Sequence, residues 1–254
     1  MHHGAEGFSW RAVLPERTQA AMGSRKPLAR IEFGRGLASA DEAMGDTEWP
    51  DAMPDIMREV GEDDTIETVL VPVAVARALG SSDEPEPTCR AELLYRVRET
   101  ADACAWAKLV DLVSRHEHAS EEVRQRLVRD GYSRACAERV VERGIASRIV
   151  SDKRFVDSFV RMKLASGWGP VRIERELSRR GIDTSELEGW PEAFLGENSP
   201  LERACELLAR KRVPDKNAFP KLMRFLVSRG YPVSVAREAV STRLSDEGDE
   251  CQSW

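Results

Sequence analysis

Apolar residues recur at three places in the chain, with the same internal spacing in each. Two apolar residues lie four positions apart, a glycine follows four positions later, and an apolar residue comes directly after that glycine. The three segments are Val123–Tyr132, Ile173–Ile182 and Leu222–Tyr231. Apolar residues at i and i+4 lie on one face of a helix. The spacing therefore predicts one helix in each of three tandem units, over about 120–130, 170–180 and 219–229.

The glycine of each segment predicts where its helix ends. Gly131, Gly181 and Gly230 fall just after the last helical residue, where the backbone is often left-handed and glycine adopts that conformation without strain. The apolar residue after each glycine can fold back onto the last turn. We therefore expect all three glycines to end their helices in the same way.

An apolar-periodic stretch precedes each of these helices and a shorter one follows it, so each unit is predicted to contain three helices. Strand patterns are nearly absent from residue 100 onward. The predicted fold class is all-α, with three tandem three-helix repeats. The expected repeat boundaries are 92–149, 150–198 and 199–245, followed by an acidic tail over 246–254.

The N-terminal quarter of the chain has a different composition. Residues 1–63 contain scattered Gly, Pro and acidic residues and no sustained apolar period. Such a segment buries too little surface to offset the entropy of ordering, so it is predicted to be a largely disordered acidic extension. Residues 64–88 are expected to form a short strand, a helix from Pro72 to Leu79 and an acidic linker. The repeat body, about residues 90–245, is expected to fold without this region.

The net charge of −6 hides an uneven distribution. Residues 1–89 carry 8 basic and 17 acidic side chains, whereas residues 90–245 carry 30 basic and 23 acidic ones. A basic body with acidic ends suits contact with nucleic acid or with an acidic protein surface.

Few residues in the chain suggest catalysis or metal binding. His116 and His118 lie two positions apart and have no Cys or carboxylate at metal-ligand spacing. The five cysteines form no C-x-x-C pair and are expected to be reduced thiols in a cytoplasmic protein. No apolar run is long enough for a membrane span or a signal peptide. We therefore predict no enzymatic activity, no cofactor, no metal and no membrane partner.

The candidate contact surface is a stripe of arginines on the second helix of the middle repeat. Arg172, Arg175 and Arg179 recur at i, i+3 and i+7, opposite the apolar Ile173 and Leu177. The remaining candidates for partner binding are Arg180, Trp168, Arg129, Lys211, Arg224 and Arg229. Two simpler interpretations stay open. The arginines can form a solvated face neutralised by local acids, and Trp168 can belong to the core.

Several segments resemble motifs of the RecX family of recombination regulators. His118–Leu127 is similar to the family's S-x-x-E-L-x-x-K-L opening. Asp152–Arg161 resembles its D-x-R-F-A-x-x-F-V segment. Gly167–Leu177 and Arg180–Ile182 resemble the G-x-G-P-x-R-I-x-x-E-L and [KR]-G-[IV] segments that follow it.

The third unit carries the resemblance further. Arg210-Lys211 and Lys221–Tyr231 are similar to the family's R-K and R-F-L-x-R-R-G-[FY] segments, so the resemblance covers roughly residues 92–244. Ser151 departs from the pattern, because the family usually has a second acidic residue there. The joint between the first two units also has three or four extra residues.

The resemblance implies an elongated curved rod of three-helix units that acts as a monomer. It also implies binding to the RecA recombinase and its DNA filament, with modulation, generally inhibition, of recombinase, ATPase and coprotease activities in DNA repair and the SOS response. Contact with single- and double-stranded DNA through the basic surface would accompany this role. Two alternatives stay open: a helical-repeat DNA-binding protein, or a protein–protein scaffold, acting without a recombinase.

Overall fold

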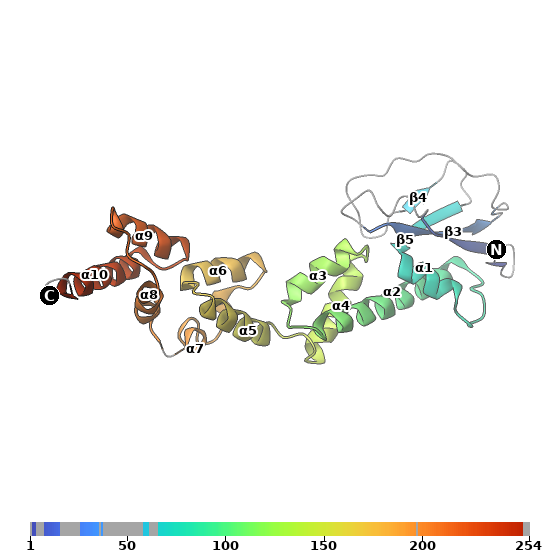
Figure 1. Cartoon of the computed structure of the whole chain (residues 1–254). Helices are drawn as coiled ribbons and strands as arrows, with labels where there is room; N and C mark the ends of the chain where they lie inside the picture. The colour runs from blue at the N-terminus through green and yellow to red at the C-terminus, as the bar shows by residue number, and fades with distance from the viewer. Residues whose placement is uncertain are drawn as a thin grey trace. The chain divides into compact units, whose positions relative to one another are not determined.

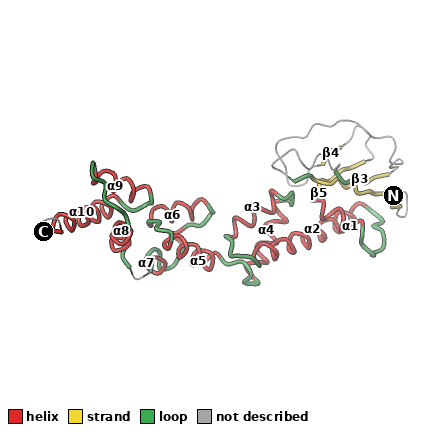
Figure 2. The backbone as a smooth tube through the Cα atoms, in the orientation of Figure 1, coloured by secondary structure: helices red, strands yellow, loops and turns green. Residues whose placement is uncertain are grey.

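The computed structural model describes residues 2–3, 8–15, 26–35, 37, 58–60, 66–196 and 198–250 of the 254-residue chain. These residues divide into two compact units. The first comprises the described residues up to His116 together with residues 122–150, and the second comprises Glu117–Glu121 and the described residues from Ser151 onward. The fold is mostly helical, as predicted, with strands confined to the N-terminal part of the described chain (Figures 1 and 2).

The first unit begins with a five-stranded sheet in the order β1-β2-β3-β5-β4, and all neighbouring strands are antiparallel. Its central strands alternate between buried and half-buried residues; Ala29, Ile31 and Phe33 of β3 all lie in the core. The strands are β1 (His2–His3), β2 (Phe8–Val13), β3 (Leu28–Arg35), β4 (Arg58–Val60) and β5 (Ile66–Pro72).

The disorder predicted for residues 1–63 is wrong for the described strands. The physical reason is that β3 pairs with both β2 and β5 along nearly its whole length, which satisfies its backbone groups. The apolar side chains on one face, including Trp10, then enter the core. The free energy gained from that burial offsets the conformational entropy lost when these strands become ordered. The rest of residues 1–63 lies outside the described residues.

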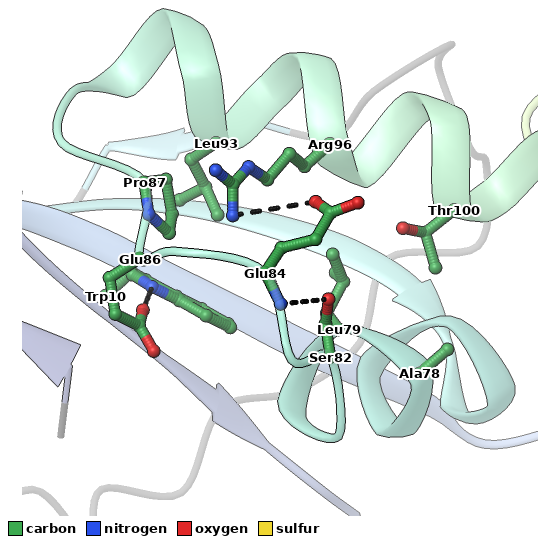
Figure 3. Close-up of a pocket in the computed structure, with 10 residues that line it drawn as sticks. All are labelled: Trp10, Ala78, Leu79, Ser82, Glu84, Glu86, Pro87, Leu93, Arg96 and Thr100. Carbon is green, nitrogen blue, oxygen red and sulfur yellow. Dashed lines mark hydrogen bonds and ion pairs between the residues drawn. The ribbon is translucent and has the colours of Figure 1, made fainter.

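Helix α1 (Val73–Gly80) packs against the sheet, and α2 (Arg90–Val113) packs against α1. The predicted strand and helix before residue 81 are therefore confirmed. The acidic linker that follows α1 is held by contacts with the sheet and with α2. Trp10 Nε1 donates a hydrogen bond of 2.9 Å to Glu86, and Arg96 lies 3.8 Å from Glu84 (Figure 3). Arg96 also donates to the carbonyl of Pro85. These contacts hold the linker against the sheet and α2, around a cavity of about 90 Å³.

The first repeat shares one hydrophobic core with the sheet. It consists of α2, α3 (Ser120–Arg129) and α4 (Arg134–Ala146). Leu93 and Val97 of α2 belong to the same cluster of buried residues as Ile31, Phe33 and Leu127. This continuity argues against the expectation that the repeat body folds fully without the N-terminal region.

The second unit contains the other two repeats, each with its own buried cluster. Repeat 2 has α5 (Asp152–Ala165), α6 (Pro170–Arg179), a 3-10 turn η3 (Thr184–Glu186) and a short α7 (Glu192–Leu195). Repeat 3 has α8 (Pro200–Ala209), α9 (Ala218–Ser228) and α10 (Val233–Glu250). The third helix expected in repeat 2 is reduced to η3 and α7, because Gly189 and Pro191 interrupt it.

The three predicted second helices are confirmed as α3, α6 and α9, and the glycines end them as expected. Gly131, Gly181 and Gly230 have φ values of 93°, 77° and 88°. In each copy the N–H of the residue after the glycine donates to a carbonyl five residues earlier, for example Tyr231 N–H to Leu226 O at 3.1 Å. This is the Schellman motif, which satisfies the last carbonyls of a helix.

Candidate functional site

The arginine stripe of α6 has the predicted orientation. Gly169 precedes the helix and Pro170 occupies its first turn, which fixes the start of α6. Ile173 and Leu177 are fully buried in the core of repeat 2. Arg172, Arg175 and Arg179 are exposed on the other side. The helix therefore separates an apolar inner face from a cationic outer face.

Local acids neutralise only part of this stripe. Glu176 forms ion pairs with Arg179, at 3.4 Å, and with Arg180. The hydrogen bond from Arg180 lowers the pKa of the Glu176 carboxyl. Burial opposes this shift, and the charges of Arg180, Arg179 and Lys163 add to it. Arg172 and Arg175 form no ion pair with any residue that the structure describes. The solvated-face interpretation thus accounts for Arg179 and Arg180 but not for the first half of the stripe.

Trp168 belongs both to the core and to the cationic surface. Its half-buried ring packs against the buried residues of repeat 2. The Arg172 guanidinium lies 3.8 Å from the ring centroid, and the Lys163 ammonium lies 4.7 Å from it. Both distances are within the range for cation–π attraction. Trp168 is therefore part of the core of repeat 2, and its role in partner binding stays a prediction.

The same arrangement recurs at two phenylalanines of this unit. Phe159 has Lys163 at 5.2 Å and Arg180 at 5.0 Å from its ring centroid. Phe225 has Lys211 at 4.3 Å and Arg229 at 5.1 Å.

The aromatic partners of these cations were not predicted from the sequence, although the sequence contains a signal for them. An aromatic residue precedes a cation by four positions in three places: Phe159 and Lys163, Trp168 and Arg172, Phe225 and Arg229. Residues at i and i+4 are neighbours on a helix surface, and a tryptophan just ahead of a helix reaches its first turn in a similar way.

A backbone joint brings the cations of repeats 2 and 3 together. The Gly169 N–H donates to Arg229 O at 2.8 Å, and the Val171 N–H donates to Gly230 O at 3.1 Å. The Arg229 guanidinium also donates to Ser166 O at 2.8 Å. The start of α6 therefore lies directly against the end of α9, which places Arg172 and Arg229 on either side of one contact.

We call four of these residues the cationic row: Lys163, Arg172, Arg229 and Lys211. None of them forms an ion pair with a described residue. A cation–π contact at an exposed site contributes about 0.5–1 kcal/mol and restricts the side chain without cancelling its charge. The row is therefore a set of held positive charges without an ion-pair partner among the described residues, suited to phosphate or carboxylate groups of a partner.

The remaining candidates are distributed less tightly. Arg224 is exposed on α9, at the position equivalent to Arg175 in α6, and Lys221 is exposed at the position equivalent to Arg172. Lys221 was not among the candidates predicted from the sequence. Arg129 is exposed on α3 in the first unit, whereas the cationic row belongs to the second unit.

The described residues offer no competing chemical site. No group of three or more His, Cys, Asp or Glu among them could hold a metal ion. Burial raises the pKa of the Cys136 thiol to about 12, which keeps it protonated and unreactive. None of the helices in the described part of the chain has the length and apolar character needed to span a membrane.

Comparison with known proteins identifies relatives over the repeat region. The family model for the second three-helix domain of RecX matches residues 151–188. Regulatory protein RecX of Pseudomonas putida (strain GB-1) is 31% identical over 144 residues, which cover 54% of this chain and 90% of that protein. Regulatory protein RecX of Pseudomonas fluorescens is 29% identical over 158 residues, which cover 61% of this chain and 97% of that protein.

Two solved structures are also similar. A crystal structure of RecX from Lactobacillus salivarius matches with a TM-score of 0.45 and 16% identity, over 56% of this chain and 96% of that one. A crystal structure of regulatory protein RecX matches with a TM-score of 0.49 and 16% identity, over 68% of this chain and 89% of that one.

Proposed function

We propose that this chain, which belongs to the RecX family of regulatory proteins, binds the RecA recombinase on DNA and inhibits its activity. Family membership confirms the resemblance seen in the sequence motifs. The relatives are named as regulatory proteins, which favours regulation over catalysis. The proposal includes a role in recombination and in the SOS response, and a location in the cytoplasm.

The cationic row is the observation that carries the proposal. Its charges come from two successive repeats that are fixed to each other through the backbone at Gly169 and Gly230. A nucleoprotein filament presents phosphates and acidic side chains at a regular spacing, and a rigid row of cations can meet several of them at once. Binding that spans neighbouring subunits would hold them in one arrangement.

Inhibition then needs no covalent step. A filament that hydrolyses ATP and exchanges strands passes through several conformations. A ligand that binds one of them more tightly shifts the population toward it and slows every step that requires the others. The protein would act as a monomer, each copy contacting the filament through its repeats.

The direct test is a titration of the cognate RecA with this protein during ATP hydrolysis on single-stranded DNA. We expect the hydrolysis rate to fall as the protein approaches the filament concentration. The suppression should weaken as salt is added, because contacts with phosphate release counterions. An unchanged rate at a large excess of the protein would refute the proposal.

A further inference from the structure

One edge of the N-terminal sheet is only partly paired. The sheet precedes the segment that resembles RecX, which spans roughly residues 92–244. Strand β1 pairs with Ser9 and Trp10 of β2, and no other strand of the described chain lies beside Ala12 and Val13 on that side. In an antiparallel sheet, every second residue of an edge strand directs its N–H and C=O groups outward. Such an edge can accept a further strand.

A groove of about 290 Å³ lies beside this edge, between β2 and α1. Three of the residues that line it are small: Ala12 of β2, and Ala76 and Gly80 of α1. A Cβ added at Gly80 would meet nothing within 4 Å, so the space beside this residue is open. The groove exists because small side chains from both elements leave the space between them unfilled.

Two large apolar side chains also line the groove. Trp10 is 4% exposed, and its hydrogen bond to Glu86 holds the indole in place (Figure 3). Leu14 is 46% exposed. An exposed leucine beside an unfilled groove is apolar surface that a partner can cover. The groove is therefore suited to an apolar side chain.

The charged residues that line the groove are both arginines, Arg11 and Arg77. Arg11 forms an ion pair of 2.6 Å with Glu32. Arg77 is exposed and forms no ion pair with any residue that the structure describes. The groove is thus basic, although residues 1–89 as a whole carry 17 acidic and 8 basic side chains. A carboxylate that enters beside an apolar side chain can pair with the Arg77 guanidinium.

We propose that this groove binds an extended peptide segment of a partner protein, in which an acidic residue lies two positions from an apolar one. We call it the β2–α1 groove, and it comprises Ala12, Leu14, Ala76, Arg77 and Gly80. The peptide pairs its backbone with the open edge of β2, places its apolar side chain in the groove and its carboxylate against Arg77. The inference goes beyond the proposed function, because it gives the N-terminal sheet a partner of its own.

Nucleic acid and a second copy of the chain are less suitable occupants. Single strands stack their bases on exposed aromatic rings, whereas the ring that lines this groove, that of Trp10, is nearly buried. A symmetric pair of β2 edges would bring two basic rims together, and like charges across a strand pair are destabilising.

Fluorescence anisotropy of a dye-labelled octapeptide, titrated with the full chain and without recombinase, tests the inference. The probe has threonine at odd positions and valine and glutamate in turn at even positions, so that valine and glutamate share one face of a strand. We expect saturable binding, and about tenfold weaker binding when lysine replaces the glutamates. N-methylation of the even or of the odd residues removes the donors of one strand edge. Only one of these two methylated peptides should lose binding.

Two variants test the groove itself. Gly80→Trp should fill it and abolish binding, whereas Ala103→Trp, which adds the same ring at an exposed position of α2, should not. Arg77→Glu should bind about tenfold more weakly. Its control is Arg126→Glu, because Arg126 is exposed on α3 and forms no ion pair with a described residue. Circular dichroism and thermal melting show whether each variant is folded; if Gly80→Trp is not, the exposed Arg77→Glu decides.

The inference is overturned by no binding of the probe, by equal binding of the lysine peptide, by equal affinity of the two methylated peptides, or by equal weakening in the control variants. Displacement of the probe by oligo(dT) would assign the groove to nucleic acid instead. A wild-type dimer that Gly80→Trp converts to a monomer would assign it to a second copy of the chain. Because the titration contains no recombinase, its failure leaves the proposed inhibition of RecA unaffected.

Discussion

Replacing Gly169 by alanine should separate repeats 2 and 3 without straining the backbone. Gly169 has a φ of −85°, which alanine adopts freely. The new Cβ would lie 2.4 Å from Gly230 O and 2.5 Å from Tyr231 N. Both are backbone atoms, which cannot rotate away as a side chain can. The start of α6 would therefore have to move by about 1 Å to reach ordinary van der Waals contact.

The energetic cost follows from the interactions that this movement breaks. Two backbone hydrogen bonds, of 2.8 and 3.1 Å, join the start of α6 to the end of α9 and would become too long. Each contributes about 0.5–1.5 kcal/mol, and relief of the overlap costs about 1–3 kcal/mol more. We expect Gly169→Ala to lower the unfolding free energy of the second unit by about 2–6 kcal/mol.

Urea unfolding followed by circular dichroism measures this decrease. The control is Gly80→Ala, the same chemical change at the end of α1, where an added Cβ would meet nothing within 4 Å. We expect the transition of the second unit to move to lower urea in Gly169→Ala and to stay in place in Gly80→Ala. Equal midpoints for the two variants would show that the joint is not a tight contact, and that the cationic row is not held across it.

Two further predictions concern the first unit. Deleting residues 1–63 removes β1 to β4, so the cluster that contains Leu93 of α2 loses Trp10, Ile31 and Phe33, at about 1.5–3 kcal/mol per large side chain. Limited proteolysis should then cut the first repeat, and a resistant first repeat would contradict the shared core. The Cys136 thiol should react with iodoacetamide at pH 8 only on unfolding, because burial raises its pKa to about 12. The exposed Cys89 should react at once. Mass spectrometry of the modified peptides measures the two rates, and equal rates would contradict the prediction.

The repeat architecture could be predicted because its signals are local. An apolar pair four residues apart and a terminal glycine act within one helix, so α3, α6 and α9 followed directly from the sequence. The strands could not be found in the same way. β3 is stabilised by β2 and β5, whose paired residues lie as far away in the chain as Leu28 and Pro72. No window of neighbouring residues contains that pairing.

The candidate site was predictable in part, for a similar reason. The outward direction of Arg172 and Arg175 follows from the helical period. The joint at Gly169 depends on the backbone of Gly230, sixty-one residues later, and becomes visible only when both repeats are placed in space. The joint shows which cations of repeat 3 lie beside those of repeat 2.

The measurement that tests the central claim most directly is the RecA ATPase titration repeated with Arg172→Glu, Arg175→Glu and Arg179→Glu in one chain. Each exposed change should alter stability by about half a kcal/mol, and Arg172→Glu by up to about 1 kcal/mol because it loses the contact with the Trp168 ring, so the variant should stay folded. A control chain with glutamate at Lys153, Arg126 and Arg134, which are also exposed, carries the same change in net charge. We expect the stripe variant to require about tenfold more protein than the wild type or the control to suppress hydrolysis. Suppression by the stripe variant at wild-type concentrations would contradict the account.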